Sequence, residues 1–153
     1  MGYKVESANE YVREVTAKYI GPRRKSFAFT RAEQVAAFIR SAMRDEAREH
    51  FFALYLDGSN CLASYSLVAI GSANRVGIHP REVFQGAILS GACAIIVGHN
   101  HPSGSLEPSD EDRSVTRALC SAGKILGISV LDHVIVSREG FCSFDTLGLM
   151  PPK

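Results

Sequence analysis

The chain contains 153 residues, 46% of them hydrophobic, and its formal net charge is +1. This length and composition fit one domain with one core, and the near-neutral charge excludes a general electrostatic attraction to nucleic acid. We expect neither a signal peptide nor a membrane span, which needs ~18 apolar residues, and four cysteines without a Cys-x-x-Cys pair favour free thiols in a cytoplasmic protein.

The first half of the chain predicts a strand, a helix and a hairpin. Alternating apolar residues indicate a strand over residues 10–20, and residues 21–26 read as a linker that contains the basic run Arg23, Arg24 and Lys25. Residues 30–33 have the pattern of a capping box, so a helix begins there. Residues 51–56 and 62–70 are typical of two strands around a turn at 57–60. We expect residues 1–45 to pack, as a strand and a helix, on a domain formed by residues 46–153.

The second half alternates helices and strands less regularly. Pro80 suits the first turn of a helix that Gly91 ends, and a buried strand follows over residues 92–97. Ser109 begins a second helix. Gly127 precedes a strand over residues 128–136, and a last short strand covers residues 141–144. This mixture predicts an α/β, or α+β, sandwich with a mixed sheet.

Two histidines at the end of the buried run 92–97 carry the chemistry of this sequence. His99 and His101 are spaced i, i+2, so both project from the same side of an extended backbone. Asp112 follows eleven residues later on a new helix and completes a third ligand position. Two imidazoles and one carboxylate, with a fourth position left for water, are a usual ligand set of a catalytic zinc ion. The spacing therefore favours a hydrolytic site with one zinc per chain.

Structural interpretations compete for parts of this pattern. Ser109 followed by Asp112 is also the pattern of a plain capping box, and His99 can be a histidine bonded to a backbone carbonyl. We weigh Asp132 and His133, inside an apolar strand, equally as outer partners of a zinc-bound imidazole and as a buried ion pair. Three other polar residues lie near these motifs. We expect His79 to be a structural loop residue and His50 to be exposed, and we expect Asn100 to hold the loop by hydrogen bonds.

The sequence His99-x-His101-Pro102, six residues, then Ser109-x-x-Asp112 resembles the JAMM (MPN-plus) metalloprotease signature. Segments 79–84 and 131–136 are similar to the RadC-type branch of that superfamily, and the resemblance covers roughly residues 45–149. It implies a single JAB/MPN-like domain with a mixed, twisted β-sheet flanked by helices. It also implies one zinc ion held by two histidines and an aspartate.

The resemblance further implies a reaction. JAMM relatives cleave peptide or isopeptide bonds with a zinc-activated water, an upstream glutamate as general base and a serine that stabilises the oxyanion. The family's register favours Glu49 as the base, with Glu46 as its competitor, and Ser109 as the serine. We therefore expect a peptide or protein substrate, whose identity stays open together with the oligomeric state.

The alternative is a DNA-repair-associated RadC-like protein that binds or acts on DNA, with a structural or nucleolytic metal site. Larger RadC-type proteins carry an N-terminal helix-hairpin-helix region, for which 45 residues are too few. A base deaminase needs His-x-Glu with Pro-Cys-x-x-Cys, and a zincin protease needs His-Glu-x-x-His; neither pattern occurs. The intact ligand set disfavours an inactive scaffold.

Overall fold

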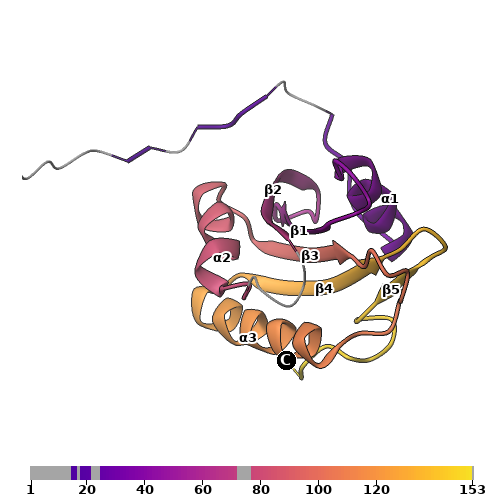
Figure 1. The fold of residues 1–153 in the computed structure, drawn as a ribbon. Helices are drawn as coiled ribbons and strands as arrows, with labels where there is room; N and C mark the ends of the chain where they lie inside the picture. The colour runs from indigo at the N-terminus through magenta and orange to yellow at the C-terminus, as the bar shows by residue number, and fades with distance from the viewer. Residues whose placement is uncertain (1–14, 17, 22–24, 72–76, 153) are drawn as a thin grey trace, which may run out of the picture.

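A computed structural model describes residues 15–152 except 17, 22–24 and 72–76. Within these residues the chain forms a five-stranded sheet of order β2-β1-β3-β4-β5 and three helices (Figure 1). Only the β3–β4 pair is parallel, so the sheet is mixed, as the sequence predicts. The elements, in chain order, are α1 Ala32–Ala42, β1 Glu49–Leu56, β2 Leu62–Gly71, α2 Pro80–Leu89, β3 Ala94–Asn100, α3 Asp110–Leu126, β4 Ser129–Val136 and β5 Phe141–Ser143.

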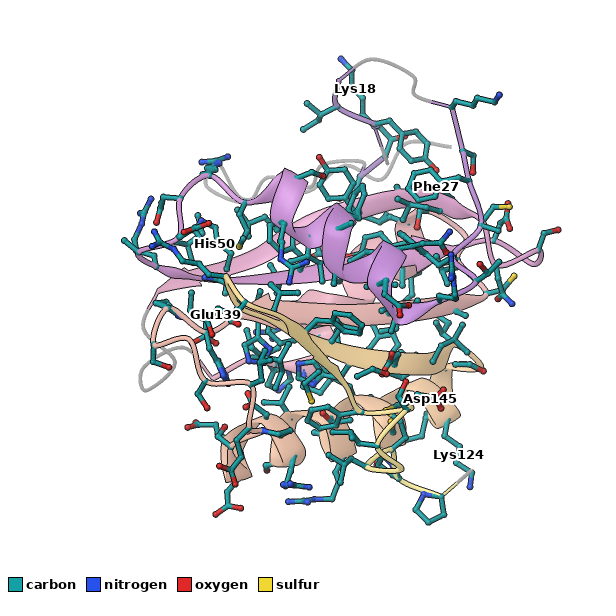
Figure 2. All side chains as sticks on the ribbon, turned by 90° about the vertical axis from the view of Figure 1, so that its right-hand side faces the viewer. Lys18, Phe27, His50, Lys124, Glu139 and Asp145 are labelled. Atoms are coloured by element: carbon teal, nitrogen blue, oxygen red, sulfur yellow. The ribbon has the colours of Figure 1, made fainter. Side chains whose placement is uncertain are left out.

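The helices cover both faces of the sheet, with α1 on one face and α3 on the other (Figures 1 and 2). Helix α1 buries Val35, Ala36 and Ile39 against alternate residues of β1, β3 and β4. Helices α2 and α3 bury Phe84 and Leu119 against the opposite set of alternate residues. Because side chains alternate along a strand, each strand residue belongs to one face only. The resulting α/β/α sandwich confirms the predicted fold class.

The parallel β3–β4 pair determines where a functional site can form. Parallel neighbours need a crossover connection, and α3 provides it between β3 and β4. The end of β3 and the start of α3 therefore meet at one edge of the sheet. Strand β1 runs antiparallel to β3, with Phe51 opposite His99, so β1 begins at that same edge.

The N-terminal region departs from the sequence prediction. Residues 1–14, 17 and 22–24 lie outside the described residues, and residues 15, 16 and 18–20 form no strand. Val15, Tyr19 and Ile20 are strongly exposed, so their alternating pattern buries no face. Helix α1 begins one residue later than predicted, because Gln34 rather than Glu33 reaches back to accept hydrogen bonds from the backbone before the helix. The predicted division at residue 45 stays a prediction, although α1 is one layer of the core.

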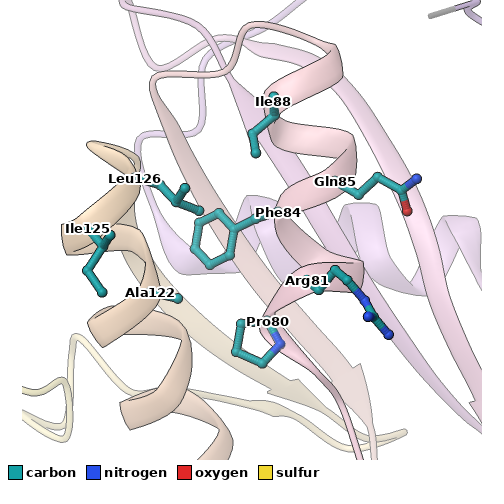
Figure 3. A pocket seen from close by; sticks show the side chains of 8 residues that line it. All are labelled: Pro80, Arg81, Phe84, Gln85, Ile88, Ala122, Ile125 and Leu126. Carbon is teal, nitrogen blue, oxygen red and sulfur yellow. The ribbon is translucent and has the colours of Figure 1, made fainter. Parts of the chain in front are cut away.

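A shallow apolar groove lies between α2 and α3 (Figure 3). Ala122 in this groove lies ten residues after Asp112, which is about 15 Å along a helix. The groove is therefore separate from the metal-binding motif. The residues lining the groove are Pro80, Arg81, Phe84, Gln85, Ile88, Ala122, Ile125 and Leu126.

None of the helices in the described part of the chain combines the length and hydropathy that crossing a membrane requires.

Candidate metal centre

The three predicted ligands come together where β3 ends and α3 begins. His99 is the last but one residue of β3. His101 follows the strand, and its amide donates to the carbonyl oxygen of Val136 in β4. Gly104, at φ +85°, reverses the chain and leads it towards α3. Asp112 is the third residue of α3 and points back to the histidines. The loop thus joins three positions that a strand and a helix hold in place.

The donor atoms of these residues have the spacing of a tetrahedral metal site. The distance from Nε2 of His99 is 2.9 Å to Nε2 of His101 and 3.1 Å to Oδ1 of Asp112. Nε2 of His101 lies 3.5 Å from Oδ2 of Asp112. Ligand atoms ~2.0–2.2 Å from a tetrahedral zinc ion are about 3.4 Å apart. The donor set therefore fits a small cation after side-chain shifts of about 0.5 Å or less.

The hydrogen bond on the far side of His101 indicates which nitrogen can bind a cation. Nδ1 of His101 lies 2.9 Å from the carbonyl oxygen of Ser105, which only accepts, so Nδ1 carries a proton. In the neutral ring, Nε2 then presents a lone pair to Asp112. The side chains of His101 and Asp112 are 13% and 12% exposed, so the site is reachable from solvent on one side.

Electrostatics couple His101 and Asp112. The hydrogen bond with Asp112 is the main cause that raises the pKa of His101 above its ordinary value, and the charge of Glu49 adds to it. Burial tends to raise the pKa of Asp112, but the close contacts of its carboxylate with His101 and His99 outweigh it and hold that pKa far below the ordinary range. Asp112 is therefore ionised at all physiological pH values. Without a metal, a proton on His101 balances this charge at pH values below the raised pKa of that histidine.

Ser109 is both a helix cap and a partner of the ligand Asp112. Its hydroxyl accepts from the amide of Asp112 and donates to Oδ2 of the same residue, at 3.1 and 2.7 Å. The Ser109 amide donates to Oδ2 as well. The capping interpretation of this motif is therefore confirmed, and it is compatible with Asp112 as a metal ligand. Oδ2 is occupied by Ser109, which leaves Oδ1 facing His99.

A buried layer of side chains supports His99 from behind. Nδ1 of His99 lies 2.8 Å from Nε2 of His133, and Nδ1 of His133 lies 2.7 Å from the hydroxyl of Thr116. His99 and His133 are fully buried. The ring of Phe51 lies nearly parallel to His99, and Phe144 stacks on His133. Burial holds the pKa of His133 well below its ordinary value.

Sequence reasoning missed Thr116, which joins α3 to this layer. Its hydroxyl also donates to the carbonyl oxygen of Asp112 at 2.7 Å. The available signal was its i, i+4 spacing from Asp112, which places both residues on one face of α3.

Asp132 and His133 have separate roles, although they are adjacent. Both ring nitrogens of His133 contact other residues, so the two side chains form no ion pair. The carboxylate of Asp132 instead accepts from the Ser143 hydroxyl and from the amides of His133 and Asp145. Burial raises the pKa of Asp132 above its ordinary range. Asp132 therefore braces the connection after β5, and His133 alone lies where an outer partner of the His99 imidazole would lie.

The two candidate general bases lie in different surroundings. Glu49 begins β1, two residues before Phe51, so it shares the face of the sheet that carries His99. Continuing the β1–β3 register by two residues brings Glu49 opposite His101, in keeping with its effect on the pKa of that histidine. Glu46 instead forms an exposed ion pair with Arg138 at 2.6 Å.

The remaining polar residues give two corrections. His50 is fully buried rather than exposed, because its position in β1 faces α1 and its ring stacks on Phe52; Figure 2 labels it. Asn100 accepts from the His50 amide and donates to the Arg48 carbonyl, so it ties β3 to the start of β1 rather than to its own loop. His79 caps α2 by accepting from the amide of Arg81, which is a structural position as expected.

Comparison with known proteins agrees with this fold. The family of the RadC-like JAB domain matches residues 29–149. A UPF0758 protein of Geobacter sulfurreducens is 47% identical over 122 residues, which are 80% of this chain and 53% of that protein. UPF0758 proteins of Trichlorobacter lovleyi and Syntrophomonas wolfei are 46% and 44% identical, over 80% and 77% of this chain and 53% and 50% of their own lengths. The chain belongs to the RadC-like JAB domain family, and it spans about half the length of the curated relatives it matches.

Proposed function

We propose that the chain is a zinc-dependent metallohydrolase, a JAMM-type metallopeptidase that cleaves a peptide or isopeptide bond. The observation that carries the proposal is the convergence of Nε2 of His99, Nε2 of His101 and Oδ1 of Asp112 within metal-ligand spacing. Two neutral imidazoles and one carboxylate suit zinc better than the oxygen-seeking calcium or magnesium. Three protein ligands leave a position open, which is the arrangement of catalytic rather than structural zinc sites.

In this proposal the metal supplies Lewis-acid chemistry, which polarises a carbonyl and lowers the pKa of a bound water to about 7. The protein residues supply the rest. Glu49 takes a proton from the attacking water and returns it to the leaving amine. Its place on the His99 face, and its effect on the pKa of His101, support this role over Glu46.

Ser109 has two roles in this proposal. Its hydroxyl fixes the Asp112 carboxylate through a 2.7 Å hydrogen bond. The same hydroxyl donates to the developing oxyanion, and donation there requires it to turn from Asp112. Such donors matter most where charge develops in the transition state.

Metal analysis tests the proposal directly. The chain, purified without added metal and then exposed to one equivalent of zinc, is expected to retain one zinc ion after desalting. His101→Ala should retain far less, whereas His79→Ala, which removes a histidine outside the site, should retain it fully. The zinc-loaded protein should cleave members of a peptide and isopeptide library. Failure to retain zinc, or equal retention by both variants, would contradict the ligand assignment.

A further inference from the structure

The hydroxyl of Thr116 has only one proton, and its environment determines where that proton goes. Oγ1 of Thr116 lies 2.7 Å from the carbonyl oxygen of Asp112, and a carbonyl can only accept. The hydroxyl therefore donates to Asp112 and has only lone pairs left for other partners. The second partner within hydrogen-bond distance of Oγ1 is Nδ1 of His133, at 2.7 Å.

This arrangement sets the direction of every following hydrogen bond. Nδ1 of His133 must donate to Thr116, so it carries a proton. His133 is fully buried, and its two ring nitrogens face a hydroxyl and another imidazole rather than a carboxylate. A buried charge without a counter-charge is costly, so the imidazole of His133 is neutral and its Nε2 carries a lone pair in place of a proton. Nδ1 of His99, 2.8 Å away, must then donate to it.

We propose that Thr116 and His133 are positioning residues that fix His99 in the tautomer whose Nε2 lone pair faces His101 and Asp112. The proposal rests on the metal site proposed above. The opposite order of hydrogen bonds would put a proton on Nε2 of His99 and block it as a ligand. Thr116 prevents that order, because its proton is engaged by the helix backbone of the same residue, Asp112, that supplies the carboxylate ligand.

Aromatic packing holds the rings of His99 and His133 in the orientation that these hydrogen bonds require. Phe51 covers one face of His99 with a ring-centroid distance of 5.8 Å and an interplanar angle of 13°. Phe144 stacks on His133 at 4.8 Å and 27°. A ring flip of either histidine would need these aromatic neighbours to move. Side chains that hold metal-binding histidines in this manner typically contribute 10- to 100-fold to metal affinity.

The test compares Thr116→Val, which keeps the shape but loses the hydroxyl, with Thr116→Ser, which keeps the hydroxyl. Long-range nitrogen–proton NMR of the metal-free protein at mildly alkaline pH reports the tautomers of His99 and His133. We expect Nδ1–H on both rings in the wild type and in Thr116→Ser, and a mixture of tautomers in Thr116→Val. Zinc affinity, measured by competition with a chelator, should fall about 10- to 100-fold in Thr116→Val and stay close to wild type in Thr116→Ser.

A second variant, His133→Phe, guards against an unfolded Thr116→Val, because Phe suits the aromatic layer while removing the acceptor for His99. It should also bind zinc more weakly, with a circular dichroism spectrum like that of the wild type. An Nε2–H proton on His99 in the wild type, or unchanged tautomers and zinc affinity in both variants, would overturn the inference. Failure of the wild type to bind zinc would instead reject the proposed function, and the tautomer spectra would still test the order of hydrogen bonds.

Discussion

Ser109 and Asp112 are joined by reciprocal hydrogen bonds, in which the Ser109 hydroxyl accepts from the Asp112 amide at 3.1 Å and donates to its Oδ2 at 2.7 Å. The same contacts begin α3 and turn the carboxylate so that Oδ1 lies 3.1 Å from Nε2 of His99. Helix initiation and ligand orientation are therefore one local structure. A substitution at Ser109 must affect both.

Replacement of Ser109 with Ala should separate its structural role from its catalytic role. Loss of an N-cap side chain lowers the free energy of unfolding by about 1 kcal/mol. Loss of an oxyanion donor lowers kcat by ~10²–10³, equivalent to ~2.7–4 kcal/mol. We expect the loss in kcat/KM to exceed the loss in stability, with the two measured by peptidase kinetics and denaturant unfolding. Ser90→Ala is the control, because Ser90 follows the last residue of α2 and its hydroxyl bonds to carbonyls of that helix. If Ser109→Ala loses activity and stability by equal free energies, Ser109 acts only as a helix cap.

Replacement of Glu49 with Gln should leave zinc binding intact and abolish hydrolysis. The amide keeps the shape of the side chain and loses the proton acceptor, and general-base catalysis is worth ~10²–10⁴-fold. Glu46→Gln is the matched control, since it removes the same charge from an exposed ion pair with Arg138 and should change turnover little. Retained turnover in Glu49→Gln together with loss in Glu46→Gln would move the role to Glu46.

Zinc affinity should rise with pH until the pH passes the folded-state pKa of His101, which lies above the ordinary value of 6.5. The sign follows from the proton that pairs with Asp112 in the metal-free protein, because zinc must displace it. Asp112 stays ionised in this window and adds nothing to the slope. Calorimetric titration in buffers of different ionisation enthalpy should show proton release. A pH-independent affinity above 6.5 would contradict the coupling of His101 and Asp112.

The stability of the metal-free protein combines two opposite pH effects. The raised pKa of His101 contributes stability that is fully present below 6.5 and lost as the pH rises through the folded-state pKa. The lowered pKa of the buried His133 works in the other direction, because unfolding below 6.5 lets that ring bind a proton. Zinc affinity is therefore the cleaner readout, since His133 stays neutral throughout.

DNA binding, if it occurs, should rest on the basic run at residues 23–25, of which Arg23 and Arg24 lie outside the described residues. Each phosphate that is neutralised contributes about −0.9 to the slope of log K against log salt. We expect a slope no steeper than about −3 and an affinity at the weak end of ~10⁻⁴–10⁻⁶ M. Submicromolar duplex binding that survives replacement of Arg23, Arg24 and Lys25 with Ala would reverse this expectation. A cytoplasmic location likewise stays a prediction.

The sequence by itself determined the local parts of this protein. The caps of α2 and α3, the turn between β1 and β2 and the two faces of each strand follow from residues close together in the chain, because capping and side-chain alternation are short-range effects. The ligands His99, His101 and Asp112 lie within fourteen consecutive residues, so their spacing already indicated a metal site.

Only the tertiary structure decided which distant residues meet. The parallel pairing of β3 and β4 brings His133 behind His99, and the crossover through α3 brings Thr116 to His133. The packing of α1 on that face of β1 buries His50, and the pairing of β4 with β5 brings Ser143 to Asp132. The exposed Val15 and Tyr19 show the converse, because an alternating pattern becomes a strand only when a neighbour offers hydrogen bonds and a face to bury. Those neighbours are set by packing across the whole sheet, which no local pattern contains.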